Sequence, residues 1–422
     1  MNGLFEDKIN NEKSNGEEKE KYILFAVSQG DQEKTDRSLD ELEELLETAG
    51  GICVARMIQN LDLPDRSTYL GKGKAAELKE LMDNLEADAI LCDDELTPVQ
   101  HRNLAELLDT KVVDRTMLIL DIFAERATTR EGKIQVEMAQ LKYRASRLTG
   151  RGTALSRLGG GIGTRGPGET KLESDRRAIR RRMDSLSAQI KSMERVRETT
   201  GKKRRESDTP VIAIVGYTNA GKSTLLNRLT DSDILAEDKL FATLDPTTRV
   251  CTLPGGQEVM MTDTVGFINK LPHHLVESFK STLEEAKKGD IILHVIDGTS
   301  DERDLHRQVV YETLKSLGIK NKPIITAYNK MDMFSEKEDA VYLRDEEAEE
   351  VVLISARTGE GLDRLFSGLE KIIRNNREYI EEIIPYSNAR RISLIRRYGE
   401  LLEEEYLEDG IMIKAYVPRS IK

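Results

Sequence analysis

The stretch that decides the fold is PVIAIVGYTNAGKSTLLNRLT, residues 210–230. It opens on an apolar, largely β-branched run that is typical of a buried strand, passes through a glycine-containing loop and continues into a helix-like segment. The loop, GYTNAGKS at 216–223, matches the pattern G-x-x-x-x-G-K-[ST]. Because that pattern identifies a phosphate-binding loop only between a strand and a helix, its context here predicts a P-loop.

Each residue type in this loop has a chemical role. Gly216 and Gly221 allow backbone N–H groups to wrap nucleotide phosphates beside the N-terminus of a helix. Lys222 is expected to reach the β- and γ-phosphates, and the Ser223 hydroxyl is expected to bind Mg²⁺. The nucleotide contacts expected from the loop are Gly216, Tyr217, Thr218, Asn219, Ala220, Gly221, Lys222, Ser223 and Thr224.

The base is predicted from a second motif, Asn329-Lys330-Met331-Asp332, which begins 107 residues after Lys222 and directly follows the strand-like run PIITAY. The Asp332 carboxylate can accept hydrogen bonds from the N1–H and the exocyclic amine of guanine. Adenine has no N1–H and would leave a buried carboxylate unpaired, which a site of this kind rejects strongly. Farther along, Ser355-Ala356-Arg357 is expected to contact guanine through its backbone. The motifs together predict GTP or GDP as the nucleotide.

Two segments between these motifs are expected to sense the γ-phosphate. In DTVG, Asp263 is expected to hold Mg²⁺ through water, and the Gly266 N–H to bind the γ-phosphate. The polar run LFATLDPTTR, 240–249, is placed as a switch, with Thr243 as the second Mg²⁺ hydroxyl and Thr247 and Thr248 as alternatives. The further nucleotide contacts expected here are Phe241, Ala242, Thr243, Leu244, Asp245, Asp263, Thr264, Val265 and Gly266.

The residue after Gly266 bears on hydrolysis. Where Ras-type proteins place a glutamine that orients the attacking water, this chain has Phe267, and a phenyl ring cannot hydrogen-bond that water. We therefore expect slow intrinsic hydrolysis that rises when a partner orders the switches or supplies a polar group. The expected catalytic set is Lys222, Thr243, Gly266 and Phe267. Asn219 resembles the asparagine that coordinates a monovalent cation in potassium-activated GTPases, so K⁺ is a further candidate cofactor.

Charge is distributed unevenly along the 422 residues. Residues 141–205 hold 19 Lys/Arg and 6 Asp/Glu, so this segment carries +13 and the remainder −25 of the total of −12. A concentrated basic segment in an acidic protein indicates contact with a polyanion, the alternative being a solvated charged helix. Three widely separated cysteines, no targeting segment and no apolar run of about 18 residues indicate a cytoplasmic protein.

The order of elements predicts a multidomain α/β protein. Strands and helices alternate through 21–130, giving a small α/β domain with a parallel sheet after a polar tail at 1–20, and LGKGKAA at 70–76 is interpreted as a flexible surface turn. Heptad-spaced apolar residues at 131–200 predict an antiparallel helical hairpin with a glycine-rich loop at its tip. GKKRRESDTP, 201–210, is expected to be a polar linker into a GTPase domain at 208–375 with a mostly parallel sheet.

The end of the chain, 376–422, is expected to be a small α+β piece. EIIPYS at 382–387, ISLIRRYGELLEEEYL at 392–407 and IMIKAYVP at 411–418 are interpreted as strand, helix and strand. About 45 residues are too few for a confident autonomous core, so this piece is expected to dock on its neighbour.

The tip loop LGGGIGTRGPGETK, 158–171, matches parts of two nucleotide-binding motifs but is not expected to bind one. A basic helix rather than a strand precedes it, and Glu169 stands where a P-loop would have its lysine. Its glycines allow close backbone approach to a partner, and its pattern favours a contacting tip over a pocket.

The chain resembles the HflX family of ribosome-associated GTPases over nearly its whole length. The motifs that carry the resemblance are YLGKGKAAEL (69–78), the run 113–148, GGGIGTRGPGETKLESDRR (159–177), GYTNAGKS, FATLDPTTR, DTVGF and NKMD. The resemblance implies that the N-terminal domain and the arm contact the large ribosomal subunit, that the protein splits ribosomes under stress, and that Ser223 and Thr243 are Mg²⁺ ligands. Phe267 agrees with the family. The residues expected to meet ribosomal RNA are Arg151, Arg157, Gly161, Gly163 and Arg165.

The expected partners are therefore the large subunit and its rRNA, with no DNA, and the protein is expected to be a monomer. Few aromatic residues and no tryptophan favour Arg/Lys contacts with phosphates over base stacking. Two alternatives stay open. One is a GTP-switched scaffold whose arm binds a protein without RNA. The other is a tRNA-modifying GTPase, which needs a catalytic cysteine, whereas Cys53 and Cys92 fall in apolar strand-like runs.

Overall fold

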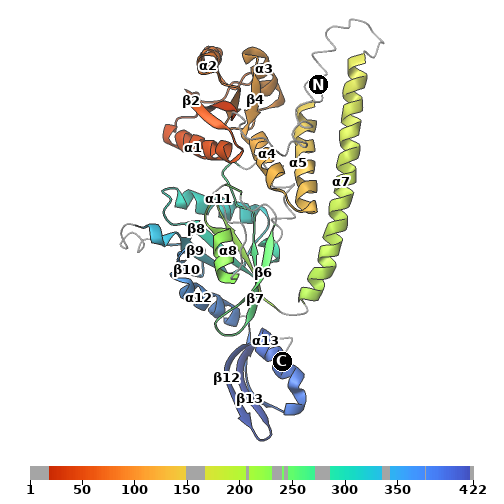
Figure 1. Ribbon diagram of the computed structural model, residues 1–422, viewed down its shortest axis with the longest axis vertical. Coiled ribbons are helices and arrows are strands. Elements are labelled where there is room, and N and C mark those ends of the chain that lie inside the picture. The colour runs from red at the N-terminus through yellow and green to blue at the C-terminus, as the bar shows by residue number, and fades with distance from the viewer. Residues whose placement is uncertain are drawn as a thin grey trace. The chain divides into compact units, whose positions relative to one another are not determined.

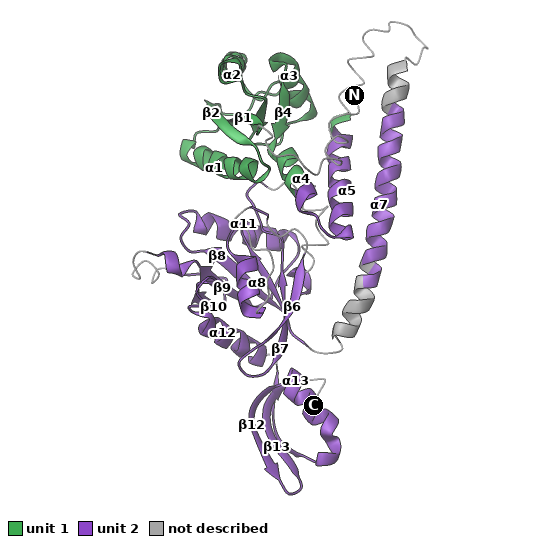
Figure 2. Cartoon of the chain, in the orientation of Figure 1, with its two compact units in different colours: residues 1–122, 147–154 green, residues 123–146, 155–422 purple. Residues whose placement is uncertain are grey.

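The computed structural model describes residues 19–148, 167–205, 209–230, 240–241, 246–270, 286–334, 343–375 and 377–418. The chain divides into two compact units, residues 1–122 with 147–154 and residues 123–146 with 155–422 (Figure 2). Over the described ranges no helix is both long and apolar enough to cross a lipid bilayer. The multidomain α/β class expected from the sequence is confirmed, whereas the finer domain boundaries stay predictions.

The first unit is built on a four-stranded parallel sheet in the order β2-β1-β3-β4. Its central strand β1 is buried on both faces beyond Lys21, as expected for a parallel strand covered by helices. Its strands are β1 (Lys21–Ser28), β2 (Ile52–Asn60), β3 (Ala89–Cys92) and β4 (Lys111–Asp114). Its helices are α1 (Gln32–Thr48), α2 (Lys72–Leu85), α3 (Pro98–Leu108) and the first part of α4 (Arg115–Arg126).

The loop at 70–76 is not the flexible turn that the sequence suggested. Helix α2 already begins at Lys72, after Gly71 as its N-cap, and Ala75 is fully buried against the sheet. Lys74 forms an ion pair with Glu77 one turn later, at 2.8 Å. The apolar packing of this first turn outweighs the low helix propensity of Gly73.

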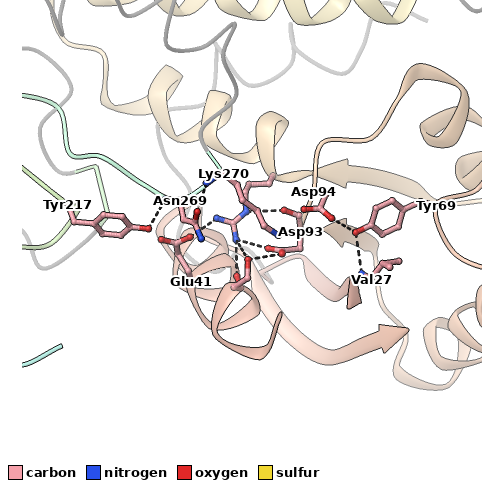
Figure 3. Close-up of polar contacts among 10 residues, drawn as sticks. Val27, Glu41, Tyr69, Asp93, Asp94, Tyr217, Asn269 and Lys270 are labelled. Atoms are coloured by element: carbon pink, nitrogen blue, oxygen red, sulfur yellow. Dashed lines mark hydrogen bonds and ion pairs between the residues drawn. The ribbon is translucent and has the colours of Figure 1, made fainter. Parts of the chain in front are cut away.

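A buried guanidinium holds the first unit together. Arg115 donates to Asp93 Oδ1 at 2.6 Å and to Glu41 Oε2 at 2.7 Å, and it also donates to the Ser38 carbonyl at 2.8 Å (Figure 3). Its charge is therefore compensated inside the protein, where an unpaired charge would be strongly destabilising. The contacts join α1, the end of β3 and the start of α4.

The helical arm consists of α5 (Arg130–Arg147) and α7 (Pro167–Arg205), which lie side by side (Figure 1). The heptad residues predicted from the sequence form the seam, with Ile134, Met138 and Leu186 buried and Leu141, Met183, Ile190 and Met193 packed against them. Arg182 and Glu137 pair across the helices at 2.6 Å. Helix α7 continues to Arg205, so the linker expected at 201–210 was placed too early. Lys and Arg favour a helix, and one interior glycine costs only about 1 kcal/mol.

The GTPase-like part of the second unit has a six-stranded sheet in the order β10-β9-β8-β5-β7-β6, in which only β6 is antiparallel to its neighbour. Its strands are β5 (Val211–Gly216), β6 (Thr247–Thr252), β7 (Glu258–Asp263), β8 (Ile291–Asp297), β9 (Ile324–Asn329) and β10 (Glu350–Leu353). Its helices are α8 (Lys222–Thr230), α11 (Arg303–Ser316), the 3₁₀ turn η3 (Met331–Met333) and α12 (Leu362–Asn375). The parallel strands all end on the same side of the sheet. The predicted motifs therefore lie together at the carboxyl ends of the strands, where α/β folds bind ligands.

The end of the chain forms a three-stranded antiparallel sheet in the order β11-β13-β12 with one helix, α13. The elements are β11 (Glu378–Ile384), the 3₁₀ turn η5 (Tyr386–Asn388), α13 (Ala389–Tyr398), β12 (Glu400–Leu407) and β13 (Gly410–Val417). The single helix expected at 392–407 is therefore wrong. Helix α13 stops at Gly399, whose φ of −89° and ψ of 166° are extended, and the following residues pair with β13.

Candidate nucleotide-binding site

The P-loop connects β5 to α8 and depends on two glycines. A Cβ at Gly216 would lie 2.2 Å from the Val295 carbonyl oxygen. A Cβ at Gly221, whose φ is +90°, would lie 2.3 Å from Asn329 Nδ2. Between them Asn219 also has a left-handed backbone, with φ of +58°. A side chain at Gly216 would collide with the backbone of β8, and one at Gly221 with the Asn329 side chain, so both positions require glycine.

Lys222 and Ser223 begin α8 and point toward the end of β7. The Lys222 ammonium donates to the Tyr217 carbonyl at 2.7 Å, and the residue is only 6% exposed. Burial lowers the pKa of Lys222 to about 8, although Asp263 opposes this shift. Ser223 Oγ donates to Asp263 Oδ2 at 2.7 Å, so the structure brings two of the predicted Mg²⁺-binding residues together.

The pKa of Lys222 predicts that nucleotide affinity falls in alkaline solution. Phosphates favour the ammonium form, so above pH 8 the nucleotide-free protein must take up a proton on binding. GDP affinity should therefore be nearly constant up to about pH 8 and about tenfold weaker at pH 9. Calorimetric titration at pH 7–9, in buffers of different ionisation enthalpy, measures both affinity and proton uptake. Equal affinity at pH 7 and 9 would contradict the prediction.

The segment after β7 lies on the P-loop. The Phe267 N–H donates to the Gly216 carbonyl at 3.1 Å, and the Thr218 N–H donates to the Phe267 carbonyl at 2.8 Å. The Phe267 side chain is 1% exposed. A Cβ at Gly266 would lie 3.1 Å from Lys222 Nζ, so the Gly266 backbone directly covers the lysine. The three predicted catalytic residues in the described part of the chain are therefore adjacent.

Tyr217 connects this segment to α11, which the sequence motifs did not indicate. Its hydroxyl accepts a hydrogen bond from the Asn269 N–H at 2.6 Å (Figure 3). Its ring stacks on His306 with centroids 3.8 Å apart and planes 15° apart. Asn269 and His306 belong to no motif, so only the folded arrangement reveals them.

The base-recognition motif is held by Asn329 at the end of β9. Its Nδ2 donates to the Ala220 carbonyl at 2.9 Å, and its Oδ1 accepts from the Ala356 N–H at 2.8 Å. The P-loop and the segment 355–357 are therefore joined through a single side chain. Lys330, at φ of +67°, pairs with Asp297 Oδ2 at 2.8 Å, and Asp297, like Asn269 and His306, belongs to no sequence motif.

Asp332 lies in η3 beside the segment that follows β10. Ser355 Oγ donates to Asp332 Oδ1 at 2.6 Å, and the Met331 N–H donates to the Ile354 carbonyl at 3.2 Å. Ser355 therefore fixes the orientation of the carboxylate that is predicted to read guanine. Arg357 follows and is exposed, and the Thr358 N–H donates to Ser355 Oγ at 3.1 Å.

The remaining predicted contacts fall into three groups. Thr264 Oγ1 donates to the Ile214 carbonyl at 2.7 Å and so supports the sheet, while Val265 is buried and Thr224 is partly buried. Phe241 packs its ring against Phe123, with centroids 4.7 Å apart. Several predicted residues lie outside the described part of the chain, namely Ala242, Thr243, Leu244, Asp245, Arg151, Arg157, Gly161, Gly163 and Arg165. Of the alternatives to Thr243, Thr248 shares a 2.9 Å hydrogen bond with Thr262.

The donor set fits magnesium with a bound nucleotide. In the described ranges, no group of three or more His, Cys, Asp or Glu side chains is arranged to hold a metal ion. Magnesium does not require such a group, because it keeps several waters and takes one or two protein oxygens plus phosphate oxygens. Ser223 could supply such an oxygen directly, and Asp263, 2.7 Å from it, could act through a bound water. The buried Thr218 hydroxyl has no hydrogen-bond partner in the described structure, as expected beside a phosphate site.

A P-loop at the carboxyl end of a mostly parallel sheet, joined through Asn329 to the segment 355–357 that contacts Asp332, is the arrangement of a P-loop GTPase. Three family models match the chain: the GTP-binding GTPase N-terminal region at 36–124, the GTP-binding GTPase middle region at 126–204 and the 50S ribosome-binding GTPase at 211–330.

Proteins described as GTPase HflX are similar over most of the chain. The Lacrimispora saccharolytica protein is 60% identical, covering 95% of this chain and 94% of its own length, and the Escherichia coli protein is 39% identical, covering 90% and 88%. The solved complex of SsGBP with GDP is 26% identical, with a TM-score of 0.47, covering 84% of this chain and 98% of that one. The chain belongs to the HflX family of GTPases, and it binds and hydrolyses GTP.

Proposed function

We propose that this GTPase associates with the large ribosomal subunit in the cytoplasm and dissociates or rescues ribosomes under stress. The observation that carries the proposal is the exposed arginine surface of α7. The described part of that helix exposes Arg177, Arg180, Arg181 and Arg182, of which Arg177, Arg180 and Arg181 share one side by helical spacing. A concentration of arginines along one long helix suits the phosphates of structured RNA, which proteins recognise mainly by shape and backbone contacts.

Two of these arginines have protein partners and two extend the predicted contact surface. Arg177 pairs with Glu173 at 2.6 Å, and Arg182 pairs with Glu137 across the arm. Arg180 and Arg181 are exposed beside them and were not among the rRNA contacts predicted from the tip. The family model named for 50S ribosome binding, which matches 211–330, supports the same partner.

The hydrolytic site supports a partner-dependent enzyme. Lys222 is placed to neutralise charge on the phosphates, and the Gly266 N–H to orient the γ-phosphate. Phe267 offers no polar group to the attacking water, so intrinsic hydrolysis is slow and the ribosome raises it. Ser223 and Asp263, with Thr243, would hold Mg²⁺, which supplies charge neutralisation at the phosphates when bound. Asn219 would add a K⁺ ligand, and equal hydrolysis rates in K⁺ and Na⁺ would discard that role.

Cosedimentation with purified large subunits tests the proposal. Binding should require a non-hydrolysable GTP analogue rather than GDP, and it should weaken steeply between 50 and 200 mM salt, on the order of tenfold or more. The double variant Arg180→Glu with Arg181→Glu should weaken binding at least about tenfold. It should also reduce the slope of log affinity against log salt concentration by about one to two. Lys320→Glu with Arg364→Glu, an equal charge change at exposed positions of the GTPase part, is the matched control.

Two results of that experiment would refute the proposal. One is binding that is absent or indifferent to the nucleotide, which would favour the GTP-switched scaffold. The other is an equal loss in the control variant. The cysteine-dependent alternative gains no support, since burial raises the pKa of Cys92 well above its usual value and desolvation also raises that of Cys53.

Deletion of residues 159–168 tests the arm tip, of which residues 159–166 lie outside the described part of the chain. Because Gly161, Gly163 and Arg165 are predicted to contact rRNA, the deletion should abolish ribosome splitting and leave GTP affinity unchanged. Light scattering of 70S ribosomes measures the first quantity, and nucleotide titration the second. Retained splitting would show that the tip is not required.

A further inference from the structure

The small sheet at the end of the chain has one covered face and one open face. Helix α13 packs on one side of the sheet (Figure 1). The buried core on that side consists of Ile380, Ile384, Ile392, Ile395, Ile411, Ile413, Ala415 and Val417. The strand register places the alternate residues on the opposite side. We call that side the open face, and its residues are Tyr379, Glu381, Ile383, Glu403, Glu405, Met412, Lys414 and Tyr416.

Apolar side chains form two rows across the open face. At one end Tyr379 pairs with Tyr416, with ring centroids 5.5 Å apart, and at the other Ile383 pairs with Met412. Tyr379 is 49% exposed and Ile383 is 54% exposed. Large apolar groups gathered on one exposed sheet face are typical of an interaction surface rather than of a solvated one.

Charge decides what kind of partner this face accepts. The middle row holds Lys414 between two carboxylates, 3.6 Å from Glu381 and 2.7 Å from Glu403. Glu405 adds a third carboxylate beside Met412, so the open face carries a net charge of −2. This sign repels nucleic-acid phosphates. It also disfavours pairing with the open face of a second copy, since like charges would then be juxtaposed.

We propose that the open face is a docking surface for a Lys/Arg-rich protein segment of the large ribosomal subunit. Tyr379 and Ile383 provide exposed apolar contact area, whereas the Tyr416 ring is covered by the Arg374 guanidinium, 5.0 Å from the ring centroid. Glu403 and Glu405 provide acceptors for ammonium or guanidinium groups. The inference rests on the proposed ribosomal function and adds to it a protein contact distinct from the rRNA contacts of the arm.

The docking surface is joined to the hydrolytic site through the hairpin between the switches. Arg397 of α13 pairs with Glu258 of β7 at 3.1 Å, and Arg374 of α12 forms an ion pair with Glu400 of β12. The Gly255 N–H, in the turn between β6 and β7, donates to Glu370 at 2.8 Å. Strands β6 and β7 lead directly to the predicted switch 240–249 and to DTVG. The sheet that carries the open face is therefore ion-paired to the β6–β7 hairpin and to α12, through Glu258 and Glu400.

Site-specific photocrosslinking identifies the occupant. The full-length protein carries p-benzoylphenylalanine at position 383 and is irradiated on purified large subunits with a non-hydrolysable GTP analogue. The expected product joins the chain to a basic ribosomal protein. Incorporation at position 406, which is also exposed but bonded to α13 through Arg396, is the control and should give little of that product. Crosslinks from 383 to rRNA alone, or none, would overturn the inference.

A charge reversal provides the quantitative test. Glu405→Lys should weaken subunit binding on the order of fivefold. Glu408→Lys, an equal change in the turn after β12, should leave binding unaltered. Both positions are exposed, so folding should be little changed. If the wild type binds the subunit and Glu405→Lys binds it equally well, this inference is refuted and the proposed function stands. Absence of nucleotide-dependent binding by the wild type would refute both.

Discussion

Replacing Asp332 with asparagine should reverse the base preference of the enzyme by a factor of about 10⁴. The carboxylate is predicted to accept from the N1–H and the amine of guanine, whereas an asparagine amide would present a donor to that amine. Xanthine carries a carbonyl where guanine carries the amine, so Asp332→Asn should lose affinity for GTP and gain affinity for xanthosine triphosphate. Ser355, which donates to Asp332 at 2.6 Å, should hold the new side chain in the same orientation.

Equilibrium titration with both nucleotides measures this reversal. Asp297→Asn is the matched control, because Asp297 pairs with Lys330 and is not predicted to touch the base edge. It should weaken both nucleotides alike and leave their ratio within a few-fold. An Asp332→Asn protein that binds GTP as tightly as the wild type would show that Asp332 does not read guanine.

Replacing Lys222 with alanine should reduce the rate of GTP hydrolysis by roughly 10²–10³-fold, since it removes a preorganised positive charge from the phosphate site. The Gly266 backbone lies next to this ammonium. The substitution therefore removes the positive charge from the place where the predicted catalytic residues are adjacent. Single-turnover hydrolysis, with and without large subunits, measures the effect.

The protein should remain folded after this change. Burial lowers the pKa of Lys222, which means that its charged form destabilises the folded, nucleotide-free protein. Lys222→Ala should therefore keep or raise the free energy of unfolding while hydrolysis is lost. Lys222→Arg keeps a charge of different shape and should restore little activity, because a planar guanidinium cannot replace a compact ammonium in this loop. Hydrolysis within about threefold of wild type in the alanine variant would contradict the assignment of Lys222.

The elements that could be predicted from the sequence are those determined by residues close together in the chain. The P-loop follows from one contiguous stretch, and the meeting of Ser223 with Asp263 follows from the rule that parallel strands end at a common edge. The heptad seam of the arm was predicted from periodicity and is confirmed by the burial of Ile134, Met138 and Leu186. In each case the pattern and the packing depend on the same few residues.

The features missed by sequence reasoning depend on partners distant in the chain. His306 and Asn269 acquire their roles only because Tyr217 contacts both. At 400–407, helical and strand patterns compete, and pairing with β13 decides for the strand. The start of α2 at Lys72 likewise depends on burying Ala75 against the sheet. Local propensity is weak at these places, and tertiary contacts override it.

The length of α7 has a mechanical consequence. Its 39 residues correspond to a rod of about 58 Å. Only residues 206–210 separate its last residue from β5, and the Val211 N–H at the start of that strand is bonded to Asp290 at 2.8 Å. Because the helix is long and its connection to β5 is short, a small rotation at its base moves its far end a long way. A tilt of about 5° displaces the far end by about 5 Å. Reorientation too small to disturb the nucleotide contacts would thus become a displacement as large as a nucleobase at the remote end of the arm.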